Sequence, residues 1–366
     1  MKTLVIAEKP SVARDIAKVL HCNKKGNNYI EGEKHIITWA LGHLVALKDP
    51  DKIDEKYKKW RLEDLPILPA KIPISVISKT SSQYKTIKEL MFSEEVENII
   101  CATDAGREGE LIFRLIYEQS RCTKPFFRLW ISSLTDESIA DGFNKLKDGS
   151  AYDSLYYSAI CRAYADWYIG MNASRLFSIH YKSVLSIGRV QTPTLALIVQ
   201  RQADIDNFIP QEYYTILGNF GDLQANWFNP ENKNAKLNKQ IATKELANHI
   251  VEECKGQECK VISNDTTRHS DIAPQLYDLT TLQREANEKF GYTADKTLKI
   301  AQELYEKYKL LTYPRTDSRY LSDDIRPKIP NLLQSLNDSF NEHVKTALQG
   351  YKNHTGKRVF NNEKVS

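Results

Sequence analysis

The segment that decides the fold is residues 99–116, which read IICATDAGREGELIFRLI. Its apolar start, Ile99 to Ala102, is typical of a buried strand, and an apolar stripe at helical spacing follows. The polar turn between them carries Asp104, and Arg107 opens the predicted helix. The segment therefore predicts a strand, a turn and a helix, with Asp104 at the carboxyl end of the strand. The stripe consists of Leu111, Ile112, Leu115 and Ile116.

A second unit of this kind begins the chain. Residues Lys2 to Ala7 are predicted to form a strand, and a helix with Pro10 in its first turn follows. Glu8 and Lys9 then lie at the carboxyl end of a strand, which in open α/β sheets borders the crevice where ligands bind. An ordinary solvated strand end is the alternative for such a pair.

Three acids are the predicted metal ligands: Glu8, Asp104 and Glu108. The first turn of a helix favours anions through its dipole, which accounts for Glu108 and Glu110 without any function. The dipole does not explain why two separate strand ends also carry acids. Hard oxygen donors that converge at such a crevice suit Mg²⁺, which keeps several waters and binds substrate phosphate.

Residues 311–318, LTYPRTDS, predict a reactive tyrosine. Pro314 pushes Tyr313 into an extended conformation, and alternate side chains of an extended segment share a face. We therefore expect Tyr313, Arg315 and Asp317 to point into one space. A guanidinium favours the phenolate and can bind a phosphate, which is suited to attack on a phosphodiester. An exposed turn with a surface aromatic is the alternative.

The middle of the chain, from Tyr152 to Asn207, is predicted to be mostly helical. In it, Thr192 is expected to cap a helix, with Pro193 at the first helical position. The free amides of a helix start beside Arg189 would form a phosphate site. Arg189, Gln191 and Thr192 are therefore predicted phosphate contacts, with an ordinary capped helix as the alternative.

Composition indicates a folded protein of several domains, with 366 residues, 41% hydrophobic content and a net charge of +4. This mild charge does not by itself indicate nucleic acid. The amino terminus has charges within its apolar part, unlike a signal peptide, and no run is long enough for a membrane span. We expect a cytoplasmic, nucleoid-associated protein. The six scattered cysteines favour free thiols, and the glycine-rich residues 350–358 do not match a P-loop, so ATP use is not predicted.

Local patterns elsewhere predict further elements. A strand is expected at residues 128–132 and a linker at residues 147–150. Residues 280–283 fit a capping box, Gly291 is expected to end that helix, and a second helix is expected from about Ala294 to Lys307. His43 is interpreted as an ordinary loop histidine.

The tyrosine segment and the two strand-turn-helix units resemble those of one family. The Tyr-Pro-Arg segment resembles the active-site segment of type IA DNA topoisomerases, in particular the topoisomerase III branch. The two strand-turn-helix units resemble a Toprim domain, which type IA and type II topoisomerases share with bacterial primases and some nucleases. That domain has a glutamate after one strand and Asp-x-Asp-x-Glu after another. Glu8, Asp104 and Glu108 match, but Gly106 replaces the middle aspartate, which leaves one or two metal ions open.

The resemblance implies a multidomain α/β plus α fold. A Rossmann-like Toprim domain is expected at residues 1–150 and a helical DNA-binding domain at 151–211. Part of the β-rich arch of the topoisomerase ring is expected at 212–270. A helix-turn-helix-like domain of winged-helix type, carrying Tyr313, is expected at 271–366.

The resemblance also implies ATP-independent relaxation or decatenation of DNA with Mg²⁺. Tyr313 would hold the 5′-phosphate of the cut strand, and Arg315 would stabilise charge on the transferring phosphate. Glu8 would protonate the departing 3′ oxygen, a role that requires a pKa raised by its crowded carboxylate neighbours, and Lys9 would contact the scissile phosphate. Arg189, Gln191 and Thr192 would then contact the DNA backbone, and Arg107 and Asp317 join these predicted DNA contacts. The implied substrate is single-stranded or negatively supercoiled DNA, and a helicase partner is left open.

Two other functions remain at this point. Another Toprim enzyme, a primase or nuclease, would need no tyrosine. A truncated remnant without strand passage would bind single-stranded DNA and never form a covalent adduct. Relatives continue into a segment with a histidine that assists the tyrosine, so a chain that ended at Ser366 is expected to cleave weakly and not to relax plasmid.

Overall fold

The computed structural model describes residues 1–321, 323–336, 340–350, 356, 358–361, 364 and 365. It divides into two compact units. One consists of residues 1–189 and 273–366, and the other consists of residues 190–272. The first unit is discontinuous in sequence because the second is inserted between its two parts. The predicted four-domain division stays a prediction.

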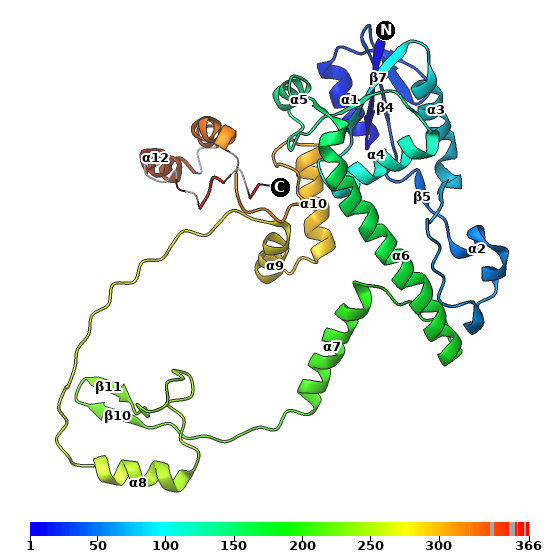
Figure 1. The fold of residues 1–366 in the computed structure, drawn as a ribbon. Coiled ribbons are helices and arrows are strands. Elements are labelled where there is room, and N and C mark those ends of the chain that lie inside the picture. Colours follow the sequence, from blue (N-terminus) through cyan, green and yellow to red (C-terminus); the bar gives the residue numbers. More distant parts are fainter. Residues whose placement is uncertain (322, 337–339, 351–355, 357, 362–363, 366) are drawn as a thin grey trace. The chain divides into compact units, whose positions relative to one another are not determined.

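The first unit is organised around a seven-stranded sheet within the described residues. Its four central strands are parallel, and the edge strands pair antiparallel (Figure 1). The predicted strands at both strand-turn-helix units are confirmed, and they are direct neighbours at the centre of the sheet. In spatial order the strands are β2 (Lys24–Lys25), β3 (Tyr29–Glu31), β4 (His35–Trp39), β1 (Lys2–Ala7), β7 (Val96–Ala102), β8 (Phe126–Arg128) and β9 (Lys147–Asp148).

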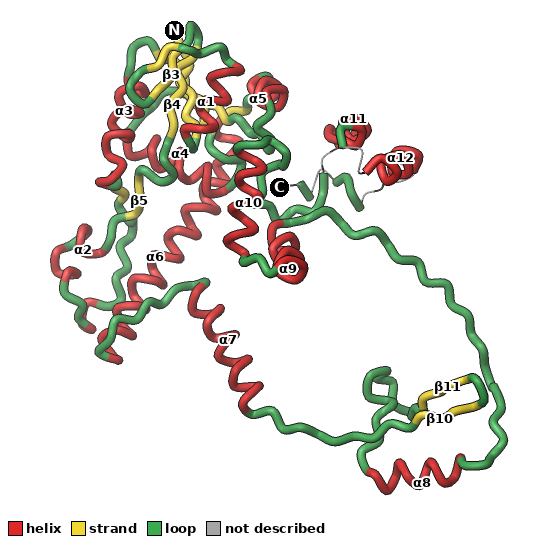
Figure 2. Tube along the Cα trace, turned by 180° about the vertical axis from the view of Figure 1, so that it is seen from behind, coloured by secondary structure: helices red, strands yellow, loops and turns green. Residues whose placement is uncertain are grey.

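Helices cover both faces of this sheet (Figure 2). Side chains alternate along β1, so Leu4 and Ile6 enter one core while Val5 and Ala7 enter the other. Helices α3 (Ser81–Phe92) and α4 (Arg107–Ser120) pack on the first core. Helices α1 (Pro10–Val19) and α5 (Asp136–Phe143) pack on the second. The result is the layered α/β architecture expected from the sequence.

The rest of the amino-terminal part attaches to this body through α6 (Asp153–Tyr181). Its Ala159 lies in the core beneath α4, and its Trp167 closes a small separate cluster with Ile67 and Ile72. The remaining elements here are β5 (Val45–Leu47), which pairs with β6 (Ile74–Val76), the short helix α2 (Pro50–Ile53), and the 3-10 turns η1 (Glu55–Lys58), η2 (Leu62–Asp64), η3 (Ser78–Thr80) and η4 (Gly149–Tyr152).

The carboxyl-terminal part of the first unit is helical. Helix α9 (Leu279–Phe290) ends at Gly291 in a left-handed conformation, as predicted, and α10 (Ala294–Glu306) follows. The predicted capping box at Thr280 is wrong, because Asp278 is the N-cap and accepts from the Thr281 amide. Beyond the tyrosine segment lie η5 (Asp323–Lys328), α11 (Ile329–Gln334) and α12 (Asn341–Gly350).

The second unit contains α7 (Gln191–Asp206), the hairpin β10 (Leu217–Phe220) with β11 (Leu223–Asn226), and α8 (Lys244–Cys254). The prediction that Thr192 caps a helix is wrong, because α7 starts at Gln191, two residues before the predicted first position Pro193, so that Val190 is the N-cap and Thr192 lies within the first turn. The β-rich arch is reduced to this short hairpin and one isolated bridge among the described residues, and α8 was not predicted.

Two boundaries in the first unit also differ from expectation. The strand predicted at residues 128–132 is β8, which ends at Arg128, because the Ser132 carbonyl accepts from the Tyr313 amide instead of a sheet neighbour. The linker predicted at residues 147–150 is strand β9 and the start of η4, held by pairing with β8. Within the described residues, no helix combines the length and apolarity needed to cross a membrane.

Candidate active site

The site is built where two parallel strands end. Glu8 follows β1 and Asp104 follows β7, and the last residues of these strands, Ala7 and Ala102, are register partners. The Asp104 amide donates to Glu8 Oε2 at 3.1 Å. The structure thus brings together two acids that are 96 residues apart in sequence, at the edge of the sheet where the sequence placed them.

Burial dominates the electrostatics of this acid pair. Burial, and then the charge of Asp104, raises the pKa of Glu8 to about 7. Burial also raises the pKa of Asp104, although the charge of Lys9 opposes it. The sequence predicted a raised pKa for Glu8 from crowded carboxylates, and burial proves to be the larger cause. Glu8 can therefore carry a proton near neutral pH, as a general acid must.

Lys9 lies between the acid pair and α10. Its Nζ is 2.6 Å from Glu306 Oε1 and 3.8 Å from Asp104 Oδ2. Burial lowers the pKa of Lys9, but the hydrogen bond to Glu306 and the charge of Asp104 together raise it. Lys9 is therefore a fixed cation beside Asp104, in a position to meet a phosphate.

Glu108 does not complete a metal site with the other two acids. Its side chain is 68% exposed, and its Oε1 lies 2.6 Å from His43 Nε2. The hydrogen bond between them lowers the pKa of Glu108 and raises that of His43. Among the described residues, no three His, Cys, Asp or Glu side chains are gathered as a cation site. In this structure Glu108 contacts His43 and is not gathered with Glu8 and Asp104, so the three-acid metal site stays a prediction.

The donor chemistry nevertheless fits Mg²⁺. Glu8 and Asp104 lie side by side, and the charge of Asp104 makes it harder to ionise Glu8, as its raised pKa shows. A divalent cation relieves that repulsion and prefers carboxylate oxygens. Glu108 lies in the first turn of α4, one helical turn beyond Asp104, and could join after leaving His43.

Tyr313 packs against this site from the carboxyl-terminal part of the chain. Its amide donates to the Ser132 carbonyl at 2.8 Å, and its ring meets that of Tyr305 edge-on, with centroids 5.7 Å apart. Burial raises the pKa of Tyr313, and the charges of Asp104 and Glu8 raise it further. The structure thus places the predicted nucleophile within the field of the acid pair.

Arg315 acts on Tyr313 in the predicted direction, but with less effect than expected. Its charge lowers the pKa of Tyr313, while burial and the acids raise it by more, so the phenol is harder to ionise than a free one. Arg315 and Asp317 are exposed and Tyr313 is half-buried, and the prediction that the three side chains point into one space stays a prediction. Arg107 is exposed at the first position of α4.

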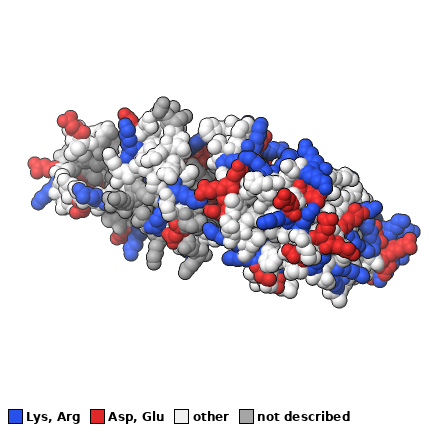
Figure 3. Space-filling view, turned by 90° about the horizontal axis from the view of Figure 1, so that it is seen from above, with Lys and Arg blue, Asp and Glu red and all other residues white. Residues whose placement is uncertain are grey.

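The predicted DNA-backbone contacts fall on both sides of the division between the units. Arg189 belongs to the first unit and pairs with Asp166 of α6, with Nε 2.7 Å from Oδ1. Gln191 and Thr192 belong to the second unit. Over the face seen in Figure 3, acidic and basic side chains are interspersed, in keeping with the small net charge.

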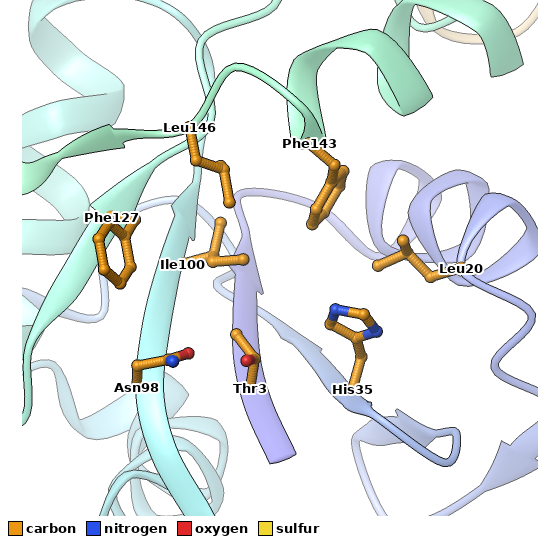
Figure 4. A pocket seen from close by; sticks show the side chains of 8 residues that line it. All are labelled: Thr3, Leu20, His35, Asn98, Ile100, Phe127, Phe143 and Leu146. Carbon is orange, nitrogen blue, oxygen red and sulfur yellow. The ribbon is translucent and has the colours of Figure 1, made fainter. Parts of the chain in front are cut away.

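Two cavities of the described residues differ in their relation to the site, because one lies among α4, α6 and β5 and the other lies beside the seven-stranded sheet. One of 330 Å³ adjoins the site, with Glu108, His43 and Arg162 in its lining. The other, of 390 Å³, lies toward the amino ends of the strands and away from the acids. Figure 4 shows Thr3, His35 and Asn98 on one side of it, opposite Phe143 and Leu146. Only the first cavity is part of the candidate active site.

Three residues near the site escaped the sequence analysis. His43 was interpreted as an ordinary loop histidine, and Glu306 and Arg128 were not singled out. Only the fold brings Glu306 to Lys9, 297 positions away, and Arg128 to the backbone of Asp104. The one available signal was an arginine in an otherwise apolar strand, which must find partners when buried.

Family models match most of the chain. A model described as DNA topoisomerase matches residues 150–366, which is more than half of the chain, and one described as Toprim domain matches residues 3–134. The Toprim domain and the type IA topoisomerases use Mg²⁺ in general, and the type IA enzymes bind DNA.

Known proteins agree with these models. DNA topoisomerase 3 of Bacillus cereus is 51% identical over 335 residues, which cover 91% of this chain and 45% of the relative. DNA topoisomerase 3 of Bacillus subtilis is 46% identical, over 100% of this chain and 50% of the relative. The chain spans about half the length of these curated relatives.

A solved structure gives the fold. Full-length topoisomerase I from Thermotoga maritima matches with a TM-score of 0.65 and 24% identity, over 91% of this chain and 52% of that one. The Toprim sheet, the tyrosine segment packed on its acidic edge and both family matches lead to one assignment. This chain belongs to the DNA topoisomerase family, and it is most like the topoisomerase 3 enzymes among the relatives named here.

Proposed function

We propose that the protein to which this sequence belongs is an ATP-independent type IA topoisomerase. It cleaves and rejoins one DNA strand through a 5′-phosphotyrosine and so relaxes or decatenates DNA. The observation that carries the proposal is the placement of Tyr313, held by the Ser132 carbonyl and the Tyr305 ring, where the charges of Glu8 and Asp104 act on its phenol. The family match over residues 150–366 supports this function over a primase, a nuclease or a DNA-binding remnant.

In this mechanism the phenolic oxygen of Tyr313 attacks the scissile phosphorus and gives its proton to solvent water as the new bond forms. The bond to the 3′ oxygen breaks, and Glu8, with a pKa of about 7, gives its proton to that oxygen. Lys9 and Arg315 neutralise charge on the transferring phosphate. Lys9 exchanges Glu306 for the phosphate as the strand enters.

Mg²⁺ would be held by Glu8 and Asp104, with Glu108 joining from the first turn of α4. When bound, the ion supplies positive charge that orients and neutralises the phosphate backbone. Arg189, Gln191, Thr192, Arg107 and Asp317 are the proposed DNA contacts. Single-stranded DNA is the proposed substrate, and a nucleoid location and a helicase partner remain predictions.

The test is incubation with end-labelled single-stranded DNA and Mg²⁺, followed by denaturation and mapping of any covalent adduct. We expect the label on Tyr313 and its loss in Tyr313→Phe. Tyr305→Phe is the matched control, because Tyr305 is a buried tyrosine in ring contact with Tyr313. An adduct on another residue, or one undiminished in Tyr313→Phe, would contradict the proposal.

A further inference from the structure

Beneath the turn that carries Asp104 lies a fully buried arginine. Arg128, the last residue of β8, has no exposed surface, and neither does Glu110 of α4, its ionic partner. Arg128 Nε lies 3.0 Å from Glu110 Oε2, as an ion pair rather than an aligned hydrogen bond. A buried charge of this kind is costly unless its other protons are also satisfied.

Those protons go to the backbone around the acid. Arg128 donates to the carbonyls of Cys101 at 3.1 Å, Thr103 at 2.8 Å and Asp104 at 2.7 Å, and to its own neighbour Leu129 at 2.8 Å. Three of these four acceptors belong to the end of β7 and the turn after it. One rigid guanidinium therefore determines where the backbone of this turn lies.

Two further contacts confine the same turn. The Thr103 hydroxyl donates to the Gly109 carbonyl at 2.8 Å, which ties the turn to α4. A side chain at Gly109 would come within 2.2 Å of the Asp104 carbonyl oxygen, so the helix approaches as closely as a glycine permits. The Asp104 amide, held by this backbone, is the group that donates to Glu8.

We propose that Arg128, supported by Glu110, is a positioning residue that fixes the Asp104 turn and so sets the spacing of the Glu8–Asp104 acid pair for a divalent cation. This inference depends on the proposed function only in what the bound cation is used for. In the proposed role Arg128 contacts neither DNA nor the reacting atoms. It acts through the backbone carbonyls that it binds.

The opposing explanation is that Arg128 only stabilises the core. Arg114 allows the positioning role and the stabilising role to be distinguished. It contacts the same Glu110, with Nε 2.8 Å from Oε1, and is itself nearly buried. Its other bonds go to the Gly149 carbonyl and to Asp153, away from the Asp104 turn. Arg114→Lys is therefore the matched control for Arg128→Lys, since each keeps its charge beside Glu110 but loses the guanidinium fork.

The experiment measures Mn²⁺ binding to the whole chain by electron paramagnetic resonance, without DNA, beside thermal unfolding and hydrogen exchange of the peptide spanning residues 99–111. We expect Arg128→Lys to weaken Mn²⁺ binding about 10- to 100-fold, as loss of groups that orient metal ligands does, and to speed exchange in that peptide. Arg114→Lys should leave the Mn²⁺ affinity and the exchange rate of that peptide within about twofold of wild type, even if its unfolding temperature falls as much as that of Arg128→Lys.

Equal effects of the two variants, or an unchanged Mn²⁺ affinity and exchange rate in Arg128→Lys, would overturn the inference. If the wild type gives no measurable Mn²⁺ binding, the exchange comparison decides alone. Failure of the proposed function looks different: the wild type would bind Mn²⁺ and form no covalent DNA adduct, while the contrast between Arg128→Lys and Arg114→Lys persisted.

Discussion

Removing the Glu8 carboxylate should change how the stability of the first unit depends on pH. In the folded chain burial and Asp104 raise the pKa of Glu8 from an ordinary 4.5 to about 7. Below pH 4.5 the group is protonated in both states and contributes no difference. Between pH 4.5 and 7 the unfolded chain releases this proton first, so stability falls as pH rises, and above pH 7 the loss is complete.

The size of this effect follows from the interval between the pKa of Glu8 in the unfolded chain and its pKa in the folded chain. Each pH unit between 4.5 and about 7 costs about 1.4 kcal/mol, so wild type should lose about 3 kcal/mol between pH 4 and pH 8 through Glu8. Glu8→Gln resembles the protonated acid and can still accept from the Asp104 amide. The variant should therefore lack this loss and be the more stable chain at pH 8.

Urea unfolding in EDTA at several pH values measures the difference. Intrinsic fluorescence reports mainly on the first unit, because four of the five tryptophans lie in it: Trp39, Trp60, Trp130 and Trp167. Glu108→Gln is the control, because the hydrogen bond from His43 lowers the pKa of Glu108 and its removal should act in the opposite sense with pH. The raised pKa of Glu8 would be refuted if the free energies of unfolding of wild type and Glu8→Gln changed in parallel with pH. A variant less stable than wild type at pH 8 would refute it as well.

Three further outcomes test the geometry around the site. Gly106→Asp should lower the half-saturating Mg²⁺ concentration for adduct formation about tenfold, because a Cβ at Gly106 meets open space and a carboxylate adds an oxygen ligand. A higher half-saturating concentration would mean that position 106 does not face the ion. Gly109→Ala should destabilise the first unit by about 1–3 kcal/mol in thermal unfolding, because its Cβ would clash with the Asp104 carbonyl; an unchanged midpoint would exclude that clash. Lys309→Met, which removes the part-buried ion pair with Asp15, should cost about 1 kcal/mol and speed hydrogen exchange at residues 307–316. Asp15→Asn should match it and the double variant should add nothing, whereas additive effects would show that the pair does not interact.

Local pattern determined much of the fold. The strand Lys2–Ala7, the last four residues of the strand Val96–Ala102, and the helices that begin at Pro10, Arg107 and Ala294 follow from periodicity and turn residues that act over a few positions. Two strands of one sheet with an acid after each also implied that Glu8 and Asp104 meet. The predictions failed where neighbours in space decide, as at the predicted linker 147–150, where residues 147–148 form a strand because β8 pairs with them and residues 149–150 begin η4.

The sequence by itself therefore determined the α/β layer, its acidic edge and the tyrosine segment, since these depend on contacts within a few residues and on the direction of parallel strands. Only the tertiary structure decided how the side chains are used. Glu108 turns to His43, Lys9 binds Glu306 across 297 positions, and Arg128 is buried beneath Asp104. The ionisation of Tyr313 was likewise beyond the sequence, because burial and two acids outweigh the arginine two residues away. Partners distant in sequence and exclusion of water set these energies, and neither is visible in a local pattern.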